Sequence, residues 1–380
     1  RADRAHALWV LGRTAFYANQ MSDAVRLLRD AVPLVDVPAL LTEILLTLAP
    51  ALSTVGHPDE ALEMLEDPAL ELESRFAGQL RNQRGIILTE LNRLPEALEQ
   101  TQQARVLLHD AGDTQRETRA LVNLGAITSV MGELGDAERW YAEARDLATE
   151  TGQDVVASAI EGNLGYVESR RGNFAAALDW YGRARRRFQG FEEVDLLEAV
   201  LEVDHARTLL DVGLDDDAAD AAQRATESAT AGGNRMLETQ SRLLLAEALV
   251  RLGEHRRAAD EIRRGAVLAR ELGQAAYELR SAALASELSG EQSSGVGRDT
   301  APTGAELDRF MDAGWGREAY ESALERARRL RHEDPDEARA VLLAADRRPR
   351  GLEVDPVLRA FGALLLADCL GDRADIEAAF

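Results

Sequence analysis

The chain has 380 residues, with 67 acidic and 44 basic side chains and a formal net charge of −23. A surface of this sign repels polyanions and anionic lipids, which argues against a nucleic-acid-binding protein and a membrane-surface protein. Hydrophobic residues make up 46% of the chain, too many for a disordered polymer. The length predicts either two or three globular domains or one extended repeat array.

Cys369 is the only cysteine, which excludes an internal disulfide framework and a cysteine-based zinc site. A lone thiol fits a reducing compartment, and neither a signal peptide nor an apolar run of about 18 residues is present. We therefore expect a cytoplasmic protein. The chain lacks an initiator methionine and ends at Phe380 within a helical pattern, which favours a piece of a longer protein.

Small residues recur along the chain about every 40 residues. The first member of each set is Gly12, Ala49, Gly85, Gly125, Gly165, Ala206 or Ala246. Seven positions later comes a glycine or asparagine: Asn19, Gly56, Asn92, Gly132, Gly172, Gly213 or Gly253. Alanines follow at twelve and nineteen positions, as in Ala97 and Ala104. This period indicates an internal repeat.

Each column has a physical meaning. The first small residue and the alanines allow two antiparallel helices to cross closely, whereas Gly or Asn tolerates the left-handed conformation that ends a helix. The pattern therefore predicts units of helix, tight turn, helix and longer turn. Seven such units cover residues 1–288. The polar stretch 289–303 predicts a flexible linker, and 304–380 predicts further helical hairpins that continue or cap the array.

The columns resemble the tetratricopeptide repeat, which has a small residue at position 8, alanine at 20 and 27, and an aromatic residue or leucine at 24. Tyr141 and Tyr181 occupy position 24, directly after Trp140 and Trp180, and we expect both Trp-Tyr pairs in the core. The resemblance implies an all-α fold, a right-handed α-α superhelix with a C-terminal helical extension.

A second resemblance concerns a narrower family. Residues 163–181, 209–213 and 356–361 resemble the repeat region of bacterial CHAT-domain proteins, in which a tetratricopeptide array precedes a caspase-like cysteine peptidase. This resemblance implies a regulatory or targeting role for the array. No segment of the sequence matches the peptidase itself.

Side chains that could carry chemistry are scattered. Cys369 and His205 could form a nucleophile and base, but each lies in an apolar helix pattern that predicts packing instead. No histidine pair has the spacing of a metal site on a helix, and the glycine-rich 295–297 follows no strand. We therefore expect no catalytic site, metal or cofactor, and no enzyme activity. Arg183, Arg185, Arg186 and Arg187 are expected to pair with acidic side chains.

The strongest functional candidates lie on the first helix of each unit, which lines the concave face of such arrays. A carboxamide offers donors and an acceptor, so an asparagine can hold a peptide backbone of any sequence. The predicted peptide- or protein-binding residues are Asn82, Arg119, Asn123, Asn163, Tyr166, Arg170 and Arg207. The alternative is that the asparagines satisfy backbone groups between adjacent helices.

The sequence thus predicts a scaffold that binds a protein or peptide in a concave groove. An alternative is the ligand- or peptide-sensing arm of a bacterial signal-transduction ATPase or transcription regulator. Three states of the groove stay open: empty, occupied by the 289–303 loop, or used by a homodimer.

Overall fold

The computed structural model describes residues 2–292 except 19, 67–69, 71–73 and 192–193. These residues form α-helices and short 3-10 helices, with no strand among them, so the predicted all-α fold is confirmed. The chain divides into two compact units, Arg1–Ile160 and Glu161–Phe380. Cys369, the hairpins predicted at 304–380 and the linker beyond 292 lie outside the described residues.

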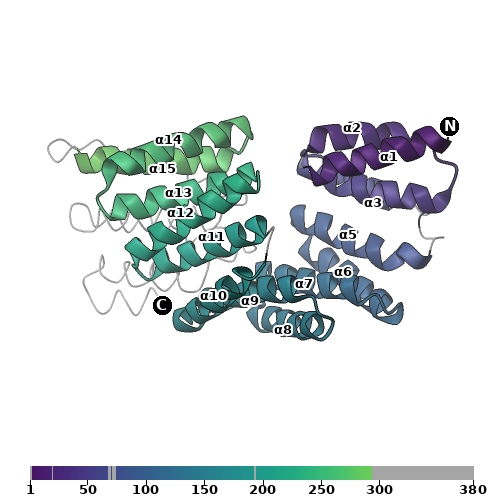
Figure 1. Cartoon of the computed structure of the whole chain (residues 1–380), viewed down its shortest axis with the longest axis horizontal. Helices are drawn as coiled ribbons and strands as arrows, with labels where there is room; N and C mark the ends of the chain where they lie inside the picture. The colour runs from purple at the N-terminus through teal and green to yellow at the C-terminus, as the bar shows by residue number, and fades with distance from the viewer. Residues whose placement is uncertain (1, 19, 67–69, 71–73, 192–193, 293–380) are drawn as a thin grey trace, which may run out of the picture. The chain divides into compact units, whose positions relative to one another are not determined.

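The first unit consists of consecutive helical hairpins (Figure 1). Its elements are α1 (Ala2–Tyr17), α2 (Met21–Ala31), η1 (Val32–Leu34), α3 (Pro38–Thr54), α4 (Pro58–Leu65), η3 (Ser74–Phe76), α5 (Ala77–Glu90), α6 (Leu94–Asp110), α7 (Thr114–Val130) and α8 (Leu134–Glu150). Helix α3 lies between α1 and α5, and the hairpin α5–α6 packs on α7. Each hairpin therefore stacks on the one before it, as a solenoid requires.

The second unit repeats this arrangement. Its helices are α9 (Asp154–Arg170), within which the unit begins, α10 (Phe174–Phe188), α11 (Asp195–Asp211), α12 (Asp215–Ala231), α13 (Arg235–Arg251), α14 (His255–Glu271) and α15 (Ala275–Gln292). Helix α15 packs on α13 and α14 as the first helix of a further hairpin would. It ends four residues into the predicted linker 289–303.

The small-residue columns mark the points where paired helices cross. A methyl group added at Gly125 would lie 2.6 Å from the Tyr141 ring, and one at Gly165 would lie 2.7 Å from the Tyr181 ring. Ala137 and Ala144 have no exposed surface. Because any larger side chain would push the two helices apart, the repeat columns follow from helix packing.

The turns between paired helices also match the sequence pattern. Gly132 has a φ of 79° and Asn92 a φ of 57°, both in the left-handed region. At the end of α7 the Glu133 N–H donates to the Thr128 carbonyl (2.9 Å), and the Gly132 N–H donates to Ser129 (3.1 Å). These two bonds form a Schellman motif that ends the helix and begins the turn.

The prediction of a longer second turn in each unit is wrong for much of the array. Only residues 111–113 separate α6 from α7, and only 232–234 separate α12 from α13. Gly112 (φ 67°) and Gly233 (φ 66°) adopt the left-handed conformation there as well. The same glycine-dependent helix end thus serves both connections, which makes successive helices nearly equivalent in length.

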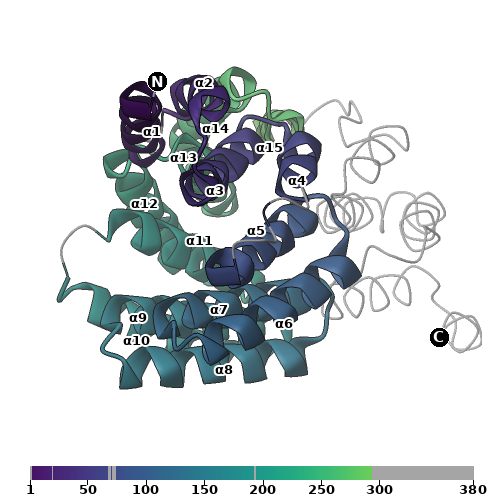
Figure 2. The same cartoon turned by 90° about the vertical axis from the view of Figure 1, so that its right-hand side faces the viewer.

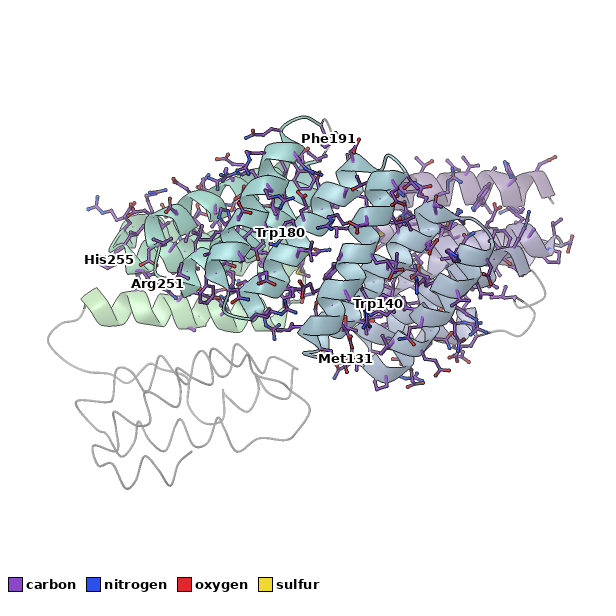
Figure 3. The ribbon with its side chains drawn as sticks, turned by 90° about the horizontal axis from the view of Figure 1, so that it is seen from below. Met131, Trp140, Trp180, Phe191, Arg251 and His255 are labelled. Atoms are coloured by element: carbon purple, nitrogen blue, oxygen red, sulfur yellow. The ribbon has the colours of Figure 1, made fainter. Side chains whose placement is uncertain are left out.

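The Trp-Tyr pairs divide between core and surface. Tyr141 and Tyr181 are 4% and 1% exposed, as predicted. The prediction of a core position is wrong for Trp140 and Trp180, which are half-buried on the second helices α8 and α10 (Figure 3). Guanidinium groups cover both indoles: Arg139 lies 4.9 Å from the Trp140 ring centre and Arg183 lies 4.2 Å from that of Trp180. A cation over the ring face makes partial exposure of these tryptophans favourable.

Candidate functional site

The predicted binding residues belong to two separate units. Asn82 on α5 and Arg119 and Asn123 on α7 lie in the first unit, whose adjacent hairpins α5–α6 and α7–α8 are visible in Figure 2. Asn163, Tyr166, Arg170 and Arg207 lie in the second unit, on α9 and α11.

In the first unit, two of the predicted asparagines contact each other. The Asn123 Nδ2 donates a hydrogen bond of 3.0 Å to Asn82 Oδ1, and both residues are partly buried. The bond joins the first helices of adjacent hairpins. Because it uses one donor of Asn123 and one acceptor lone pair of Asn82, the Asn82 amide and the Asn123 oxygen keep hydrogen-bonding capacity.

This contact differs from the alternative considered from the sequence, in which the asparagines satisfy backbone groups. In the described part of the chain no backbone partner of either carboxamide occurs. The pair is therefore a polar feature between two first helices, with one donor group and one acceptor available beside each other.

Arg119 lies one helical turn before Asn123 on the same face of α7. Its side chain is exposed, and no partner for it occurs among the described residues. The same face continues to Ala126 and to Val130, which is 56% exposed. Helix α7 thus presents a cation, a carboxamide and an apolar side chain in sequence along one exposed stripe.

In the second unit, Asn163, Tyr166 and Arg170 share one face of α9 at helical spacing. The Arg170 Nη1 donates to the Tyr166 hydroxyl (2.9 Å), and the guanidinium lies 5.8 Å from the tyrosine ring centre. This contact holds the arginine along its own helix. Arg207 on α11 is partly buried, and its side chain also interacts within the chain.

Sequence reasoning missed a recurrent buried charge at position 4 of the first helix. Glu161 on α9 is 1% exposed and lies 3.2 Å from Arg183 on α10. Glu202 on α11 is 3% exposed and accepts a hydrogen bond of 2.8 Å from Arg224 on α12. In both repeats the arginine stands 22 residues after the glutamate. The sequence therefore contains this signal as a repeated Glu-to-Arg spacing.

The electrostatics of Glu202 follow from this contact. Burial by itself would raise the pKa of the Glu202 carboxyl, but hydrogen bonds from His205 and Arg224 outweigh burial and hold the pKa below its usual value. Arg185 lies 3.9 Å from the same carboxylate. The expected pairing of the α10 arginines with acidic side chains is thus confirmed for Arg183, Arg185 and Arg187, the last of which lies 3.5 Å from Glu161.

His205 takes part in helix packing, as the sequence pattern indicated. Its ring lies 5.4 Å from the Tyr181 ring, and Nδ1 lies 3.4 Å from Glu202. No group of three or more metal-ligating side chains gathers anywhere in the described ranges. Among the helices that the structure describes, none combines the length and apolar character of a membrane span.

Comparisons with known proteins support the repeat assignment. Residues 116–190 match the family model of the tetratricopeptide repeat. Tetratricopeptide repeats are therefore present within residues 116–190. No curated protein matches the sequence.

Several solved structures share the fold. A Rap protein in complex with competence and sporulation factor is 13% identical, with a TM-score of 0.68 over 97% of this chain and 100% of that chain. Aspartyl phosphate phosphatase F from Bacillus subtilis is 13% identical, with a TM-score of 0.65 over 93% and 96%. The apo form of the quorum sensor NprR from B. thuringiensis is 14% identical, with a TM-score of 0.62 over 90% and 97%. At these identities the similarity establishes the all-α solenoid fold.

Proposed function

We propose that the first unit binds an extended peptide segment of a protein partner across α5 and α7. The observation that carries the proposal is the hydrogen bond between Asn123 and Asn82. It leaves an N–H donor group on Asn82 and a carbonyl acceptor on Asn123. A peptide unit offers the complementary acceptor and donor, so the pair can hold a main chain without reading its side chains.

Arg119 adds a preference for a ligand carboxylate beside this backbone contact. An α-helix rises about 1.5 Å per residue, so the four positions from Arg119 to Asn123 span about 6 Å. An acidic side chain or a terminal carboxylate within about two residues of the held peptide unit would reach the guanidinium. Because Arg119 lacks a partner among the described residues, a carboxylate would gain a charge-assisted bond without displacing an existing one.

The apolar end of the same stripe sets the expected character of the rest of the ligand. Val130 is exposed, and Ile86 on α5 is partly exposed. An apolar ligand side chain over Val130 would lie about 10 Å from Asn123 along the helix, which corresponds to about three residues of extended chain. The proposed ligand is therefore a short segment with a carboxylate at one end and an apolar residue at the other.

The fold comparison supports a peptide or protein ligand. A Rap protein with the same fold forms a complex with competence and sporulation factor, and NprR is a quorum sensor. Recognition of a ligand by a helical-hairpin array of this kind is consistent with the proposal for this chain.

A peptide-display selection on the full chain tests the proposal, with fluorescence anisotropy on the enriched peptides. The Asn82→Ala/Asn123→Ala variant should bind them at least about tenfold more weakly, since each hydrogen bond contributes about 1 kcal/mol. Gln102→Ala is the matched control, because it removes an exposed carboxamide from α6 in the same unit. Equal affinity of the double variant and the control would refute the proposal.

The carboxylate preference has its own test. Arg119→Gln should weaken binding of acidic peptides but not of their amide analogues. Arg186→Gln is the control, because Arg186 is an exposed arginine on α10 with no partner among the described residues. A loss that is the same for acidic and amidated peptides would contradict the role of Arg119.

We further propose that Asn163, Tyr166, Arg170 and Arg207 form a second ligand contact in the second unit. The Arg170 bond to Tyr166 holds the guanidinium along the face of α9 that also carries Asn163. Tyr166→Phe removes this bond and should weaken the binding of acidic peptides selected on the chain. The affinity of a peptide that contacts α5 and α7 alone should be unchanged. An unchanged affinity for every selected peptide would refute this second contact.

In a longer protein, the array would regulate or target a linked module. The resemblance of residues 163–181 to CHAT-domain proteins supports a cysteine peptidase as that module. The alternative is a sensor arm. It is supported by the signal transduction ATPase with a tetratricopeptide repeat sensor from Pyrococcus horikoshii, which is 17% identical, with a TM-score of 0.50 over 70% of this chain and 42% of that chain.

The coding sequence on both sides of these residues separates the two roles. A caspase-like peptidase domain downstream would support the first, and a nucleotide-binding domain upstream would support the second. Presence of neither domain would refute both.

A further inference from the structure

Three first helices of the first unit, α3, α5 and α7, carry exposed stripes in the same register. Counted from the small residue of each repeat (Ala49, Gly85 or Gly125), the residues five and one before it are buried on all three helices. Those six, three and two before it, and one after it, are partly or fully exposed. Because α3 packs on α5 and α5 packs on α7, the stripes form one surface, which contains the proposed peptide site.

Pro50 leaves a main-chain oxygen on this surface without its helical donor. It lies inside α3 and has no N–H, so the Leu46 carbonyl lacks the donor that would stand four residues later. The threonine hydroxyls of α3 donate to the carbonyls of Pro38, Glu43 and Pro50 instead. Since Leu46 and Pro50 both belong to the exposed stripe, the Leu46 oxygen is open to a donor from a ligand.

Glu43 supplies a carboxylate beside this carbonyl. It lies three residues before Leu46 on the same stripe, a rise of about 4.5 Å along the helix. Its side chain is partly exposed and has no partner among the described residues. The equivalent residue of α5 is the neutral Gln79, and that of α7 is Arg119. The α3 end of the surface thus offers two acceptors and a negative charge, whereas the α7 end offers a cation.

We infer that α3 binds a primary ammonium group of the peptide that the asparagine pair holds. The inference rests on the proposed peptide site at α5 and α7. An ammonium carries three N–H donors and a positive charge, so it can bond the Leu46 carbonyl and the Glu43 carboxylate together. A neutral donor would leave the Glu43 charge uncompensated. The group is either the amino terminus of the peptide or a lysine side chain.

The spacing of the helices fixes where the ammonium stands in the peptide. Packed helices lie about 8–10 Å apart, so α3 is about 12–15 Å from the midpoint between α5 and α7. An extended chain covers this distance in about four residues. The peptide therefore continues past Arg119 toward α3, which makes the carboxylate bound by Arg119 an acidic side chain rather than a carboxyl terminus.

Peptides enriched by display on the full chain test the inference by fluorescence anisotropy. Each is compared with forms acetylated at the amino terminus or at its lysines, which removes the ammonium charge. Acetylation of the bound group should weaken wild-type binding at least about tenfold, and the sensitive form identifies terminus or lysine as the source. Glu43→Gln should weaken the free form about tenfold and the acetylated form less than about twofold. Glu150→Gln, which removes an exposed carboxylate from α8, is the matched control and should change neither.

Pro50→Ala separates loss of the carbonyl acceptor from damage to the fold. Alanine gives the Leu46 carbonyl an N–H donor and suits a helix interior better than proline, so the variant should resist urea at least as well as wild type. It should nevertheless bind the free peptides about fivefold more weakly. Loss of the proline ring as an apolar contact would instead weaken free and acetylated peptides equally.

The outcomes distinguish this inference from the peptide site on which it rests. An acetylation penalty that is absent from wild type, or equal in wild type, Glu43→Gln and Pro50→Ala, would overturn the ammonium contact alone. If the Asn82→Ala/Asn123→Ala variant binds the same peptides as tightly as wild type, the peptide site fails and the ammonium contact fails with it.

Discussion

The close crossing of α7 and α8 at Gly125 allows a quantitative prediction for the stability of Gly125→Ala. An alanine methyl at Gly125 would lie 2.6, 2.7 and 2.8 Å from three atoms of the Tyr141 ring. Ordinary contact requires about 3.6 Å, so the ring or the helix must move by about 1 Å. Tyr141 is 4% exposed and cannot swing into solvent. We therefore take the upper end of the overpacking range, about 3 kcal/mol.

The substitution also has a favourable part. Alanine stabilises a helix interior by about 1 kcal/mol relative to glycine. Gly125→Ala should thus lower the free energy of unfolding by about 2 kcal/mol. In a Tyr141→Ala background the clash is absent, so the same substitution should stabilise by up to about 1 kcal/mol, which gives a coupling of about 3 kcal/mol.

Urea unfolding followed by far-ultraviolet circular dichroism measures all four members of this cycle. Gly135→Ala on α8 is the matched control, because a methyl group there has no neighbour within 4 Å and should be neutral or slightly stabilising. If Gly125→Ala costs the same with and without the Tyr141 ring, the packing argument for the small-residue columns is wrong.

Three further predictions concern the second-unit charges and the turns. Glu202→Gln should lower the free energy of unfolding at pH 7 by about 2 kcal/mol, because the neutral amide loses its charged bond to Arg224. Since the folded pKa of Glu202 is depressed, the stability difference between wild type and variant should persist above about pH 4.5 and vanish at lower pH. Urea titrations at several pH values measure this difference. Burial first, and then Asp195 and Glu202, raise the pKa of Glu198. Glu198→Gln should therefore stabilise the protein by about 0.5 kcal/mol at pH 7 and lose this advantage in acid, so a destabilised variant at pH 7 would contradict the pKa direction. Gly132→Ala, at a φ of 79°, should cost about 1 kcal/mol in the same assay, and a neutral result would show that the left-handed turn is not required.

The repeat and its turns could be predicted from the sequence because their causes are local or periodic. A glycine such as Gly132 ends a helix through its own backbone conformation. Small residues such as Gly125 recur wherever the same two helices cross. The half-buried position of Trp140 beside the buried Tyr141 was not predictable in this way. The Arg139 guanidinium covers the Trp140 indole, and its position depends on side-chain packing.

The candidate site shows the same limit. The sequence indicated Asn82, Asn123 and Arg119 as residues of the first helices, but it could not show that the two asparagines bond each other. It grouped Arg119 with Arg170, although Arg170 is held by Tyr166 and Arg119 has no partner among the described residues. Partners of this kind stand far apart in the chain or depend on side-chain conformation.

The array of helical hairpins could be predicted from the residues alone, because helix periodicity, turn glycines and crossing alanines act within one repeat and recur about every 40 residues. Which side chains are buried and which are exposed could be seen only from the packing of the hairpins. Leu11 on α1 and Leu48 on α3 occupy the same position in the repeat, but Leu11 is 55% exposed and Leu48 is 2% exposed. Whether a side chain is buried or available depends on its neighbours in space, and stacking of the hairpins supplies those neighbours.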